Sequence, residues 1–184
     1  MTPSEKIKVS VFIATSLDGY IARPDGDVSW LDDVEPVTEG DDMGYGALFN
    51  SVDALVMGRG SFEKVLEFDP WPYGNKPVIV LSKSLTDVSE ALRNTVRIDR
   101  SEPQALVDKL SRKGYQRIYL DGGKVIQSYL REGLVDDMCI TIIPVLLGAG
   151  IPLFSSLEKD IKLRLVDCQS WPNGMVQSTY DVVK

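Results

Sequence analysis

The sequence predicts an α/β protein with three layers, in which a mixed, mainly parallel central sheet lies between helices and gains antiparallel strands towards the C-terminus. Short runs rich in Val, Ile and Leu alternate with amphipathic stretches over the first two thirds of the chain. Such runs are typical of parallel strands that are buried on both faces. The last third instead has three strand-like runs with no long helix between them, which favours antiparallel pairing.

Four runs in the first part of the chain have the length and composition of buried strands: residues 8–15, 53–58, 77–82 and 117–121. Helical patterns fall between and after them, at residues 42–51, 61–66, 102–113 and 123–131. A succession of strand, helix and strand requires right-handed crossovers, so these strands are expected to be parallel.

The strand-like runs of the last third are residues 135–148, 161–171 and 174–183. The final two are joined through Pro172, Asn173 and Gly174, which form a strong turn signal. No repeat, low-complexity segment or long linker divides the 184 residues, of which 43% are hydrophobic. We therefore expect one domain that spans residues 1–184.

The composition argues against several kinds of partner. The net charge is −7 and no basic stripe is present, whereas nucleic-acid binding requires clustered Lys and Arg to neutralise phosphates. The N-terminus lacks a signal-peptide pattern, and no apolar run is long enough to span a membrane. We expect a cytoplasmic protein with no nucleic-acid or membrane partner.

The chain contains no histidine, which excludes a Ser-His-Asp triad and the histidine-containing zinc site of a nucleobase deaminase. Its two cysteines, Cys139 and Cys168, fall in predicted strands, where free cysteine usually acts as a small buried hydrophobe. We expect no metal site. Any chemistry must therefore use carboxylates, hydroxyls, lysines or a bound cofactor.

Three predicted strands end in residues that can bind phosphate. Gly122 and Gly123 follow one strand and precede a helix, where backbone N–H groups are free and glycine allows close approach. A tight turn would explain this glycine pair equally well, and the pattern is not the Gly-x-Gly-x-x-Gly fingerprint. The other two strand ends supply glycines, hydroxyls and cations, with Ser61 as a candidate N-cap; they comprise Gly58, Arg59, Gly60, Ser61, Ser82, Lys83 and Ser84. Together the three ends favour a ligand with several phosphates, such as a dinucleotide.

The segments VMGRGSFE (56–63), KPVIVLSKS (76–84) and YLDGGKVI (119–126) resemble, in order and spacing, the cofactor-binding framework of the dihydrofolate reductase-like superfamily. The segments VFIATSLDGYIA (11–22) and IIPVLLGAGIPLF (142–154) are more similar to its RibD C-terminal reductase branch. The resemblance extends over residues 9–154. It implies a dihydrofolate reductase-like fold and NADPH as the cofactor.

The resemblance also implies roles for the residues that match. The nicotinamide pocket would be lined by Ala14, Thr15 and Ser16. The phosphates would be held by Gly58, Arg59, Gly60 and Ser61, with Arg59 favouring NADPH over NADH. The adenosine 2′-phosphate would lie near Ser82, Lys83 and Ser84, and the pyrophosphate would meet Gly122, Gly123, Lys124 and Val125.

Two aspartates are candidates for further roles. Asp121 would repel a pyrophosphate, so we expect its side chain to turn away and accept backbone N–H groups. Asp27 precedes Trp30 at a spacing similar to that of the acid and tryptophan in dihydrofolate reductases; buried beside Trp30, it would have a raised pKa and donate a proton. The alternative is a solvated acidic loop in which Asp32 or Asp33 caps a helix.

The substrate is less well defined by the sequence. Trp30 and Phe49 are candidates to line its pocket, although aromatic residues on amphipathic elements are more often core residues. Trp71 lies in a proline-flanked loop that covers the sheet edge or acts as a lid. By the same resemblance, the apolar segment 144–150 would contribute to a homodimer interface.

The predicted function is an NADPH-dependent reductase of a small heterocyclic molecule, resembling the 5-amino-6-(5-phosphoribosylamino)uracil reductase of riboflavin biosynthesis. Cations for a substrate phosphate, beyond those assigned to NADPH, are not evident in the sequence. Two alternatives remain open: a dihydrofolate reductase that acts on a pterin, and a non-catalytic dimeric module that binds NADPH.

Overall fold

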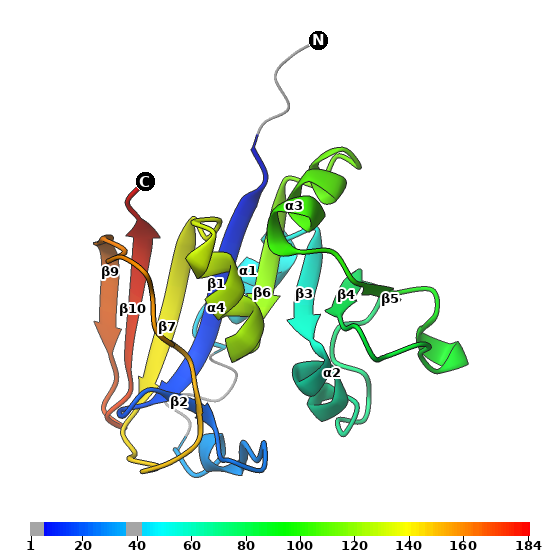
Figure 1. Cartoon of the computed structure of the whole chain (residues 1–184). Coiled ribbons are helices and arrows are strands. Elements are labelled where there is room, and N and C mark those ends of the chain that lie inside the picture. The colour runs from blue at the N-terminus through cyan, green and yellow to red at the C-terminus, as the bar shows by residue number, and fades with distance from the viewer. Residues whose placement is uncertain (1–5, 36–41) are drawn as a thin grey trace.

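The computed structural model describes residues 6–35 and 42–184. Its main sheet has eight strands in the order β5-β4-β3-β6-β1-β7-β10-β9 (Figure 1). The parallel strands are β1 (Lys8–Ser16), β3 (Ala54–Gly58), β4 (Val78–Leu81), β5 (Val96–Asp99), β6 (Arg117–Asp121) and β7 (Asp137–Ile143). Strands β10 (Val176–Val182) and β9 (Leu163–Ser170) extend this sheet in antiparallel pairing. The predicted mixed, mainly parallel sheet with antiparallel C-terminal strands is confirmed.

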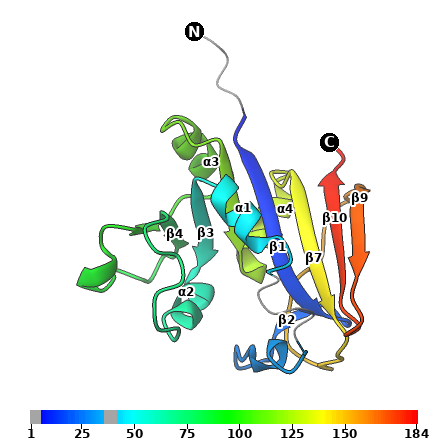
Figure 2. The ribbon, with the colours of Figure 1, turned by 180° about the vertical axis from the view of Figure 1, so that it is seen from behind.

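Helices cover the two faces of the parallel part of the sheet. Helices α3 (Pro103–Ser111) and α4 (Gly123–Arg131) lie in front of the sheet in Figure 1, and α1 (Tyr45–Ser51) lies on the opposite face, towards the viewer in Figure 2. Helix α2 (Arg59–Val65) follows β3. Two short 3-10 turns, Ser29–Leu31 and Glu90–Leu92, lie in connecting segments. Among the described residues, no helix has the length and apolar character needed to cross a membrane.

The strand bounds differ from the predicted ones where a local rule was overlooked. Strand β7 ends at Ile143, because Pro144 has no N–H to donate to a sheet. Strand β5 was not predicted: its four residues are too few, and too polar at Arg97, to stand out as an apolar run. The small second sheet, which pairs β2 (Tyr20–Ala22) with β8 (Ile151–Pro152), was not predicted either.

The core lies on both faces of the parallel strands. Along β3, Ala54 and Val56 pack in one buried cluster with residues of α3 and α4, while Leu55 and Met57 pack in a second cluster with Phe62 of α2. Side chains of a strand alternate between the two faces of a sheet, so an apolar run with no alternation predicts burial on both sides. This explains why β3 was recognisable from the sequence.

The antiparallel end of the sheet is packed differently. Every residue of β9 is exposed, and every residue of β10 is half-buried. Cys168 on β9 is therefore exposed and Cys139 on β7 is only half-buried. The expectation that both cysteines are buried is wrong, because the helices cover the parallel strands and leave β9 uncovered (Figure 2).

Candidate functional site

The connections of two neighbouring strands leave the sheet on opposite faces. Strands β3 and β6 pair in parallel; β3 leads into α2 and β6 leads into α4. In an open α/β sheet, ligands bind beyond the carboxyl ends of the strands at such a switch point. A cavity of about 1050 Å³ lies here, lined by the ends of β3, β4, β5, β6 and β1. The volume is at the upper end of the range for small-molecule sites, on the order of 300 to 1000 Å³.

The glycines at this switch point are required by the packing between the two strand ends. Gly122 has a φ of 91°, a conformation that side chains disfavour, and a Cβ atom at this position would overlap Oγ of Ser61. A Cβ atom at Gly123 would lie 2.8 Å from the carbonyl oxygen of Pro152. The two glycine-containing junctions therefore touch each other, and the backbone at the start of α4 borders the cavity.

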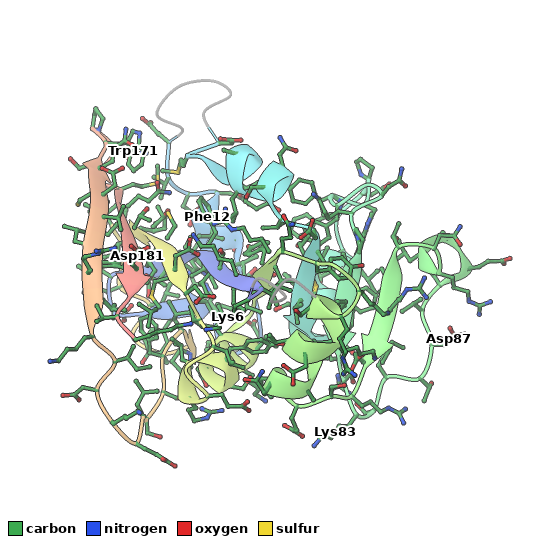
Figure 3. All side chains as sticks on the ribbon, turned by 90° about the horizontal axis from the view of Figure 1, so that it is seen from above. Lys6, Phe12, Lys83, Asp87, Trp171 and Asp181 are labelled. Atoms are coloured by element: carbon green, nitrogen blue, oxygen red, sulfur yellow. The ribbon has the colours of Figure 1, made fainter. Side chains whose placement is uncertain are left out.

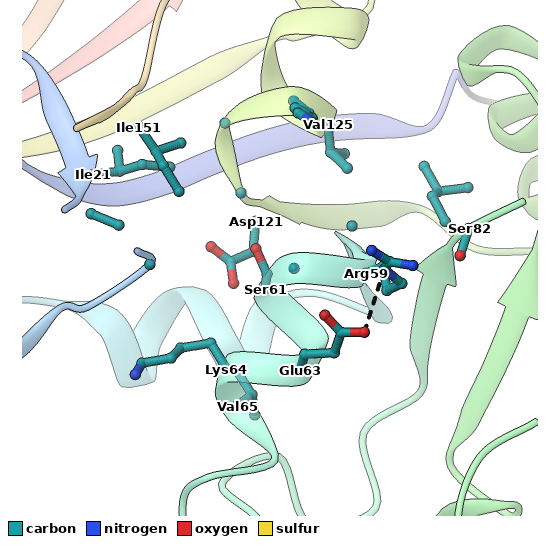
Figure 4. A pocket seen from close by; sticks show the side chains of 18 of the residues that line it. Ile21, Arg59, Ser61, Glu63, Lys64, Val65, Ser82, Asp121, Val125 and Ile151 are labelled. Atoms are coloured by element: carbon teal, nitrogen blue, oxygen red, sulfur yellow. Dashed lines mark ion pairs between the residues drawn. The ribbon is translucent and has the colours of Figure 1, made fainter. Parts of the chain in front are cut away.

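The hydroxyl of Ser61 suggested that this residue is the N-cap of α2, but the structure shows that it is not. The helix begins at Arg59 with Gly58 as its N-cap, so Ser61 lies within the first turn. Its side chain lines the cavity beside Asp121 (Figure 4). The prediction of a cap was wrong because the helical conformation continues directly from the strand, without an intervening loop.

Cations are concentrated at one end of the cavity. Arg59 forms an ion pair with Glu63 at 3.3 Å (Figure 4) and donates a hydrogen bond to the hydroxyl of Ser84 at 2.9 Å. Lys83 forms an exposed ion pair with Glu102 at 3.3 Å. Exposed pairs of this kind contribute little to stability, about 0 to 1 kcal/mol. Both cations can therefore exchange their carboxylate partners for a phosphate at small cost.

Two further cations line the cavity. Lys124 lies in the first turn of α4, and Arg100 follows β5. Within the described part of the chain, neither has a hydrogen bond or ion pair to another side chain. Arg100 was missed in the sequence because β5 was not recognised as a strand, so its end was not considered as a ligand-binding position.

The three residues predicted at the end of β1 are not equivalent. Ala14 lines the cavity. Thr15 and Ser16 are buried and are not among the residues that line it. The hydroxyl of Ser16 donates to Asp18 at 2.5 Å and accepts the N–H of Tyr20 at 3.0 Å. The structure thus uses Ser16 to hold the turn after β1, which corrects its predicted place in the nicotinamide pocket together with that of Thr15.

Asp121 lies in the middle of the cavity, beside Ser61 (Figure 4). Burial raises the pKa of its carboxyl to about 6, and the hydrogen bond from the N–H of Gly122 acts in the opposite direction. The expectation that Asp121 turns away from the site is wrong, although it does accept a backbone N–H. The carboxyl follows the three buried residues of β6 and is desolvated by the elements around it, which explains the raised pKa.

Asp27 has the opposite character. It is not among the residues that line the cavity, and its side chain accepts hydrogen bonds from the hydroxyl and N–H of Ser29, which lower its pKa. It also forms an ion pair with Arg23 at 3.4 Å. The expectation of a buried Asp27 with a raised pKa is wrong, and the alternative of a solvated acidic loop describes this segment better.

The aromatic residues predicted for the substrate pocket belong to the core. Trp30 is buried against Ile143 and Met175. Phe49 stacks on Tyr73 and packs against Tyr45. Neither is among the residues that line the cavity, so their assignment to a substrate pocket is corrected. Aromatic residues on amphipathic elements are more often core residues, and that alternative describes both Trp30 and Phe49.

For Trp71 the sequence left two alternatives, a loop that covers the sheet edge and a lid. Trp71 packs edge-on against Phe62 of α2 at a ring distance of 6.2 Å and against Tyr73 at 5.2 Å. It does not line the cavity described here, and its half-buried ring covers the end of the second core cluster.

The end of the cavity near β1 has a mainly apolar lining that the sequence did not reveal. Ile21 of β2 and Ile151 of β8 lie on the side away from Arg59 and Ser82 (Figure 4). They are brought there by the pairing of β2 with β8. The two strands are more than a hundred residues apart in the chain, so no local pattern could predict that they share a site. Lys64 of α2 also borders this end.

Comparison with known proteins identifies relatives over nearly the whole chain. The model of the RibD C-terminal domain matches residues 7–177. The uncharacterized protein YwjB of Bacillus subtilis (strain 168) is 36% identical over 160 residues, which cover 86% of this chain and 88% of YwjB.

Solved structures agree with this match. A protein from Shewanella sp. PV-4, provisionally named for riboflavin biosynthesis, is 41% identical and superposes with a TM-score of 0.91, covering 97% of this chain and 100% of that one. A deaminase/5-amino-6-(5-phosphoribosylamino)uracil reductase from Thermotoga maritima has a TM-score of 0.72 at 16% identity, covering 97% of this chain and 57% of its own. At that identity the likeness supports the fold alone. The chain belongs to the RibD C-terminal domain family, with the dihydrofolate reductase-like fold.

Proposed function

We propose that this chain is an NADPH-dependent reductase of a small heterocyclic substrate. The observation that carries the proposal is the cavity at the switch point, where glycine junctions and cations at one end meet a carboxyl with a raised pKa in the middle. Membership of a family that contains reductases supports the same reaction class.

The residues present fit a dinucleotide phosphate. The start of α4 offers free backbone N–H groups next to a glycine whose conformation no other residue adopts easily. The proposed phosphate ligands come from three adjacent strand ends; they are Gly58, Arg59, Gly60, Ser61, Ser82, Lys83, Ser84, Gly122, Gly123, Lys124 and Val125. We add Arg100 to this set, because it lies at the end of the next strand along the sheet. Ala14 remains the proposed contact of the nicotinamide.

When bound, NADPH supplies a hydride and leaves as NADP⁺. The chain itself must supply a proton, and Asp121 is the group best suited to do so. Its carboxyl lines the cavity and has a pKa of about 6, so part of the population is protonated near neutral pH. In the reduction of a substrate C=N bond, the carbon accepts the hydride and the nitrogen accepts the proton of Asp121. The carboxylate that remains is reprotonated from water.

The two alternatives are distinguished by different observations. A pterin reductase of the kind considered requires Asp27 in the pocket, and the ion pair of Asp27 with Arg23 outside the cavity lining argues against it. A non-catalytic module would bind NADPH equally well but would not oxidise it with any substrate. The carboxyl of Asp121 in the cavity favours the enzyme, because a binding module has no need for a repulsive group beside its ligand.

A fluorescence titration with NADPH and with NADH tests the cofactor part of the proposal. Saturable binding with a clear preference for NADPH is expected, and no binding of either at millimolar concentration would contradict it. Oxidation of NADPH in the presence of 5-amino-6-(5-phosphoribosylamino)uracil, its unphosphorylated form or dihydrofolate then tests catalysis. Tight binding of NADPH without oxidation by any of them would favour the non-catalytic module.

We also propose a homodimer in which β9 contributes to the interface, instead of relying on residues 144–150 alone. Leu165 and Val166 of this edge strand are 55% and 57% exposed, and a long uncovered edge strand readily pairs with another chain. Arg164 and Asp167 would face each other in two symmetric pairs if β9 paired antiparallel with a second copy about a two-fold axis between Leu165 and Val166. Sedimentation at micromolar concentration tests this, with a monomer as the contrary result.

A cytoplasmic location also stays a proposal, supported by the two free cysteines.

A further inference from the structure

The charges around the cavity are distributed unequally between its two ends. We call the end near β5, β4 and β3 the phosphate end; its lining has four cations, Arg59, Lys83, Arg100 and Lys124, the hydroxyls of Ser82 and Ser84, and three carboxylates, Glu63, Asp99 and Glu102. The opposite end, near β1, β2 and β8, is called the substrate end; it is lined by Ala14, Ile21, Asp25, Val28, Lys64 and Ile151. The order β5-β4-β3-β6-β1 in the sheet separates the two ends.

The substrate end has one lysine in its described lining, and that lysine is paired with a carboxylate of the same end. Nζ of Lys64 lies 2.7 Å from a carboxylate oxygen of Glu67. The hydrogen bond that Lys64 donates to Glu67 raises the pKa of Lys64, and the carboxylates of Asp27 and Asp25 act in the same direction. In the lining, Asp25 and Glu67 outnumber the one ammonium group, so this end keeps a net negative charge even if an anion displaces Glu67 from Lys64.

The next cation in this region is also paired. Arg23 lies just outside the lining, and its Nε is 3.4 Å from Asp27. Residues 36–41, which lie outside the described residues, include no Lys or Arg. The chain therefore brings no unpaired cation to the substrate end within the part that the structure describes.

The carboxylates at this end would repel an added anion. Asp25 and Glu67 line the cavity with Lys64, and Asp121 lies between the two ends (Figure 4). A phosphate monoester carries a charge of about −1.5 to −2 near neutral pH. Proteins bind such groups with Arg forks, Lys or helix N-termini, and here these groups lie at the phosphate end, where NADPH would occupy them.

We infer that the substrate of this chain is an unphosphorylated nitrogen heterocycle, uncharged or cationic, with a reducible C=N bond. The inference rests on the proposed reductase function and names the substrate class of the same cavity. The apolar side chains of Ile21, Val28 and Ile151 would contact the ring, and Asp121 would face the nitrogen that is protonated. This separates the chain from the reductase that its Thermotoga maritima relative is named for, whose substrate carries a phosphate.

A matched pair of compounds tests the inference: 5-amino-6-ribosylaminouracil and its 5′-phosphate. The protein is saturated with NADPH, and kcat/KM is measured for each compound from the loss of nicotinamide absorbance. We expect kcat/KM to be at least about tenfold higher for the unphosphorylated compound, which corresponds to about 1.4 kcal/mol. An equal or higher value for the phosphate overturns the inference.

Binding gives a second readout that does not depend on turnover. The ribitylamino forms of both compounds, with and without phosphate, are titrated calorimetrically into the protein loaded with NADP⁺. The unphosphorylated compound is expected to bind at least about tenfold more tightly. If neither binds while NADP⁺ does, the substrate class is wrong and the cofactor proposal stands. If NADP⁺ itself does not bind, the proposed function fails.

A charge variant locates the effect at Lys64. Glu67→Gln removes its partner, so the preference for the unphosphorylated compound should fall severalfold. Glu90→Gln is the matched control, since it removes the same charge in the 3-10 turn Glu90–Leu92, which is not part of the cavity lining; it should leave the ratio unchanged. A ratio that Glu67→Gln does not alter would overturn the role given to the Lys64 and Glu67 pair.

Discussion

The parallel strands and the antiparallel strands of this sheet differ in what covers them. Leu55 and Val56 of β3 are 0% exposed, whereas Leu165 and Val166 of β9 are 55% and 57% exposed. Viewed from above in Figure 3, Lys83 and Asp87 lie at the opposite side of the molecule from Trp171 and Asp181. The helices that cover the parallel strands also bring their loops to one edge, where the cavity lies. The hairpin of β9 and β10 extends the sheet, but none of its loops lines the cavity.

The comparison predicts where substitutions affect chemistry, stability or association. The parallel part should contain the positions at which a single change is costly, because its side chains have no water to replace a lost partner. The antiparallel edge should tolerate change, except through contact with another chain. Five predictions test this difference.

The largest effect is expected at Asp121. Asp121→Asn should lower kcat by about 10²–10⁴-fold, as is typical for the loss of a general acid. In the unchanged protein, the protonated carboxyl is the working form and its pKa is about 6, so kcat should fall about tenfold per pH unit above pH 6. The variant should lose this pH dependence. Asp108→Asn, on the exposed side of α3, is the control and should leave the profile as it is.

The raised pKa of Asp121 also predicts how the stability of the fold depends on pH. The pKa of Asp121 is raised above the ordinary value of 3.8, so the folded chain holds the proton more tightly than the unfolded chain does. Its contribution to stability is complete below about pH 3.8 and is lost as the pH rises through about 6. Urea unfolding of the protein and of Asp121→Asn between these values should show the difference. A constant difference would mean that the carboxyl is not desolvated.

The two leucines give the direct test of packing. Leu55→Ala should lower the free energy of unfolding by about 2 to 5 kcal/mol, because it leaves a cavity between β3 and its neighbours. Leu165→Ala on β9 should cost less than about 0.5 kcal/mol in the monomer, as expected of an exposed position. Urea unfolding at several protein concentrations measures both. The cost at Leu165 should grow at concentrations where the proposed homodimer covers β9, and a cost that stays constant would contradict that interface.

The glycines at the cavity give an intermediate effect. Gly122→Ala should cost about 1 to 3 kcal/mol and weaken NADPH binding, because the residue must hold a φ of 91° and its new methyl group overlaps Ser61. Gly133 also has a positive φ, of 65°, but no atom lies within 4 Å of an added Cβ. Gly133→Ala therefore serves as the control for backbone strain alone. Equal effects of the two variants on NADPH binding would mean that Gly122 only makes a turn.

The smallest effect is expected at Arg59, whose partners in the free protein are exposed. Arg59→Ala should weaken NADPH binding about tenfold, the value of one charge-assisted contact of about 1.4 kcal/mol, and should weaken NADH binding less. Arg93→Ala, which removes an exposed arginine paired with Asp87, is the control. An equal loss for NADPH and NADH would remove Arg59 from recognition of the 2′-phosphate.

Several parts of the site could be predicted from the sequence because they depend on local pattern. Gly58, Arg59, Ser82 and Gly122 each follow an apolar run that could only be a buried strand, and the ends of parallel strands meet at one edge of a sheet. The structure brings these residues together around one cavity. The short edge strand β5 alternates in polarity and gave no such signal. Arg100, which follows β5, was therefore not predicted as a site residue.

The sequence did not predict which acidic side chain faces the cavity. Asp27 beside Trp30 looked like a proton donor, while Asp121 looked like a structural residue, and the structure reverses both environments. The reason is desolvation, which depends on all the segments packed around a carboxyl. Asp27 is held by its own loop through Ser29 and Arg23. Asp121 is enclosed by elements that lie far from it in the chain.

The sequence by itself determined the order of the helices and of the longer strands, the mixed sheet and the glycine and cation positions at the ends of β3, β4 and β6, because each depends on residues close together in the chain. Only the tertiary structure decided that β3 lies beside β6, that β2 pairs with β8 to form an apolar substrate end, and that β9 stays uncovered. These features depend on contacts between distant segments. Burial, and with it the pKa of Asp121, exists only once those contacts have formed.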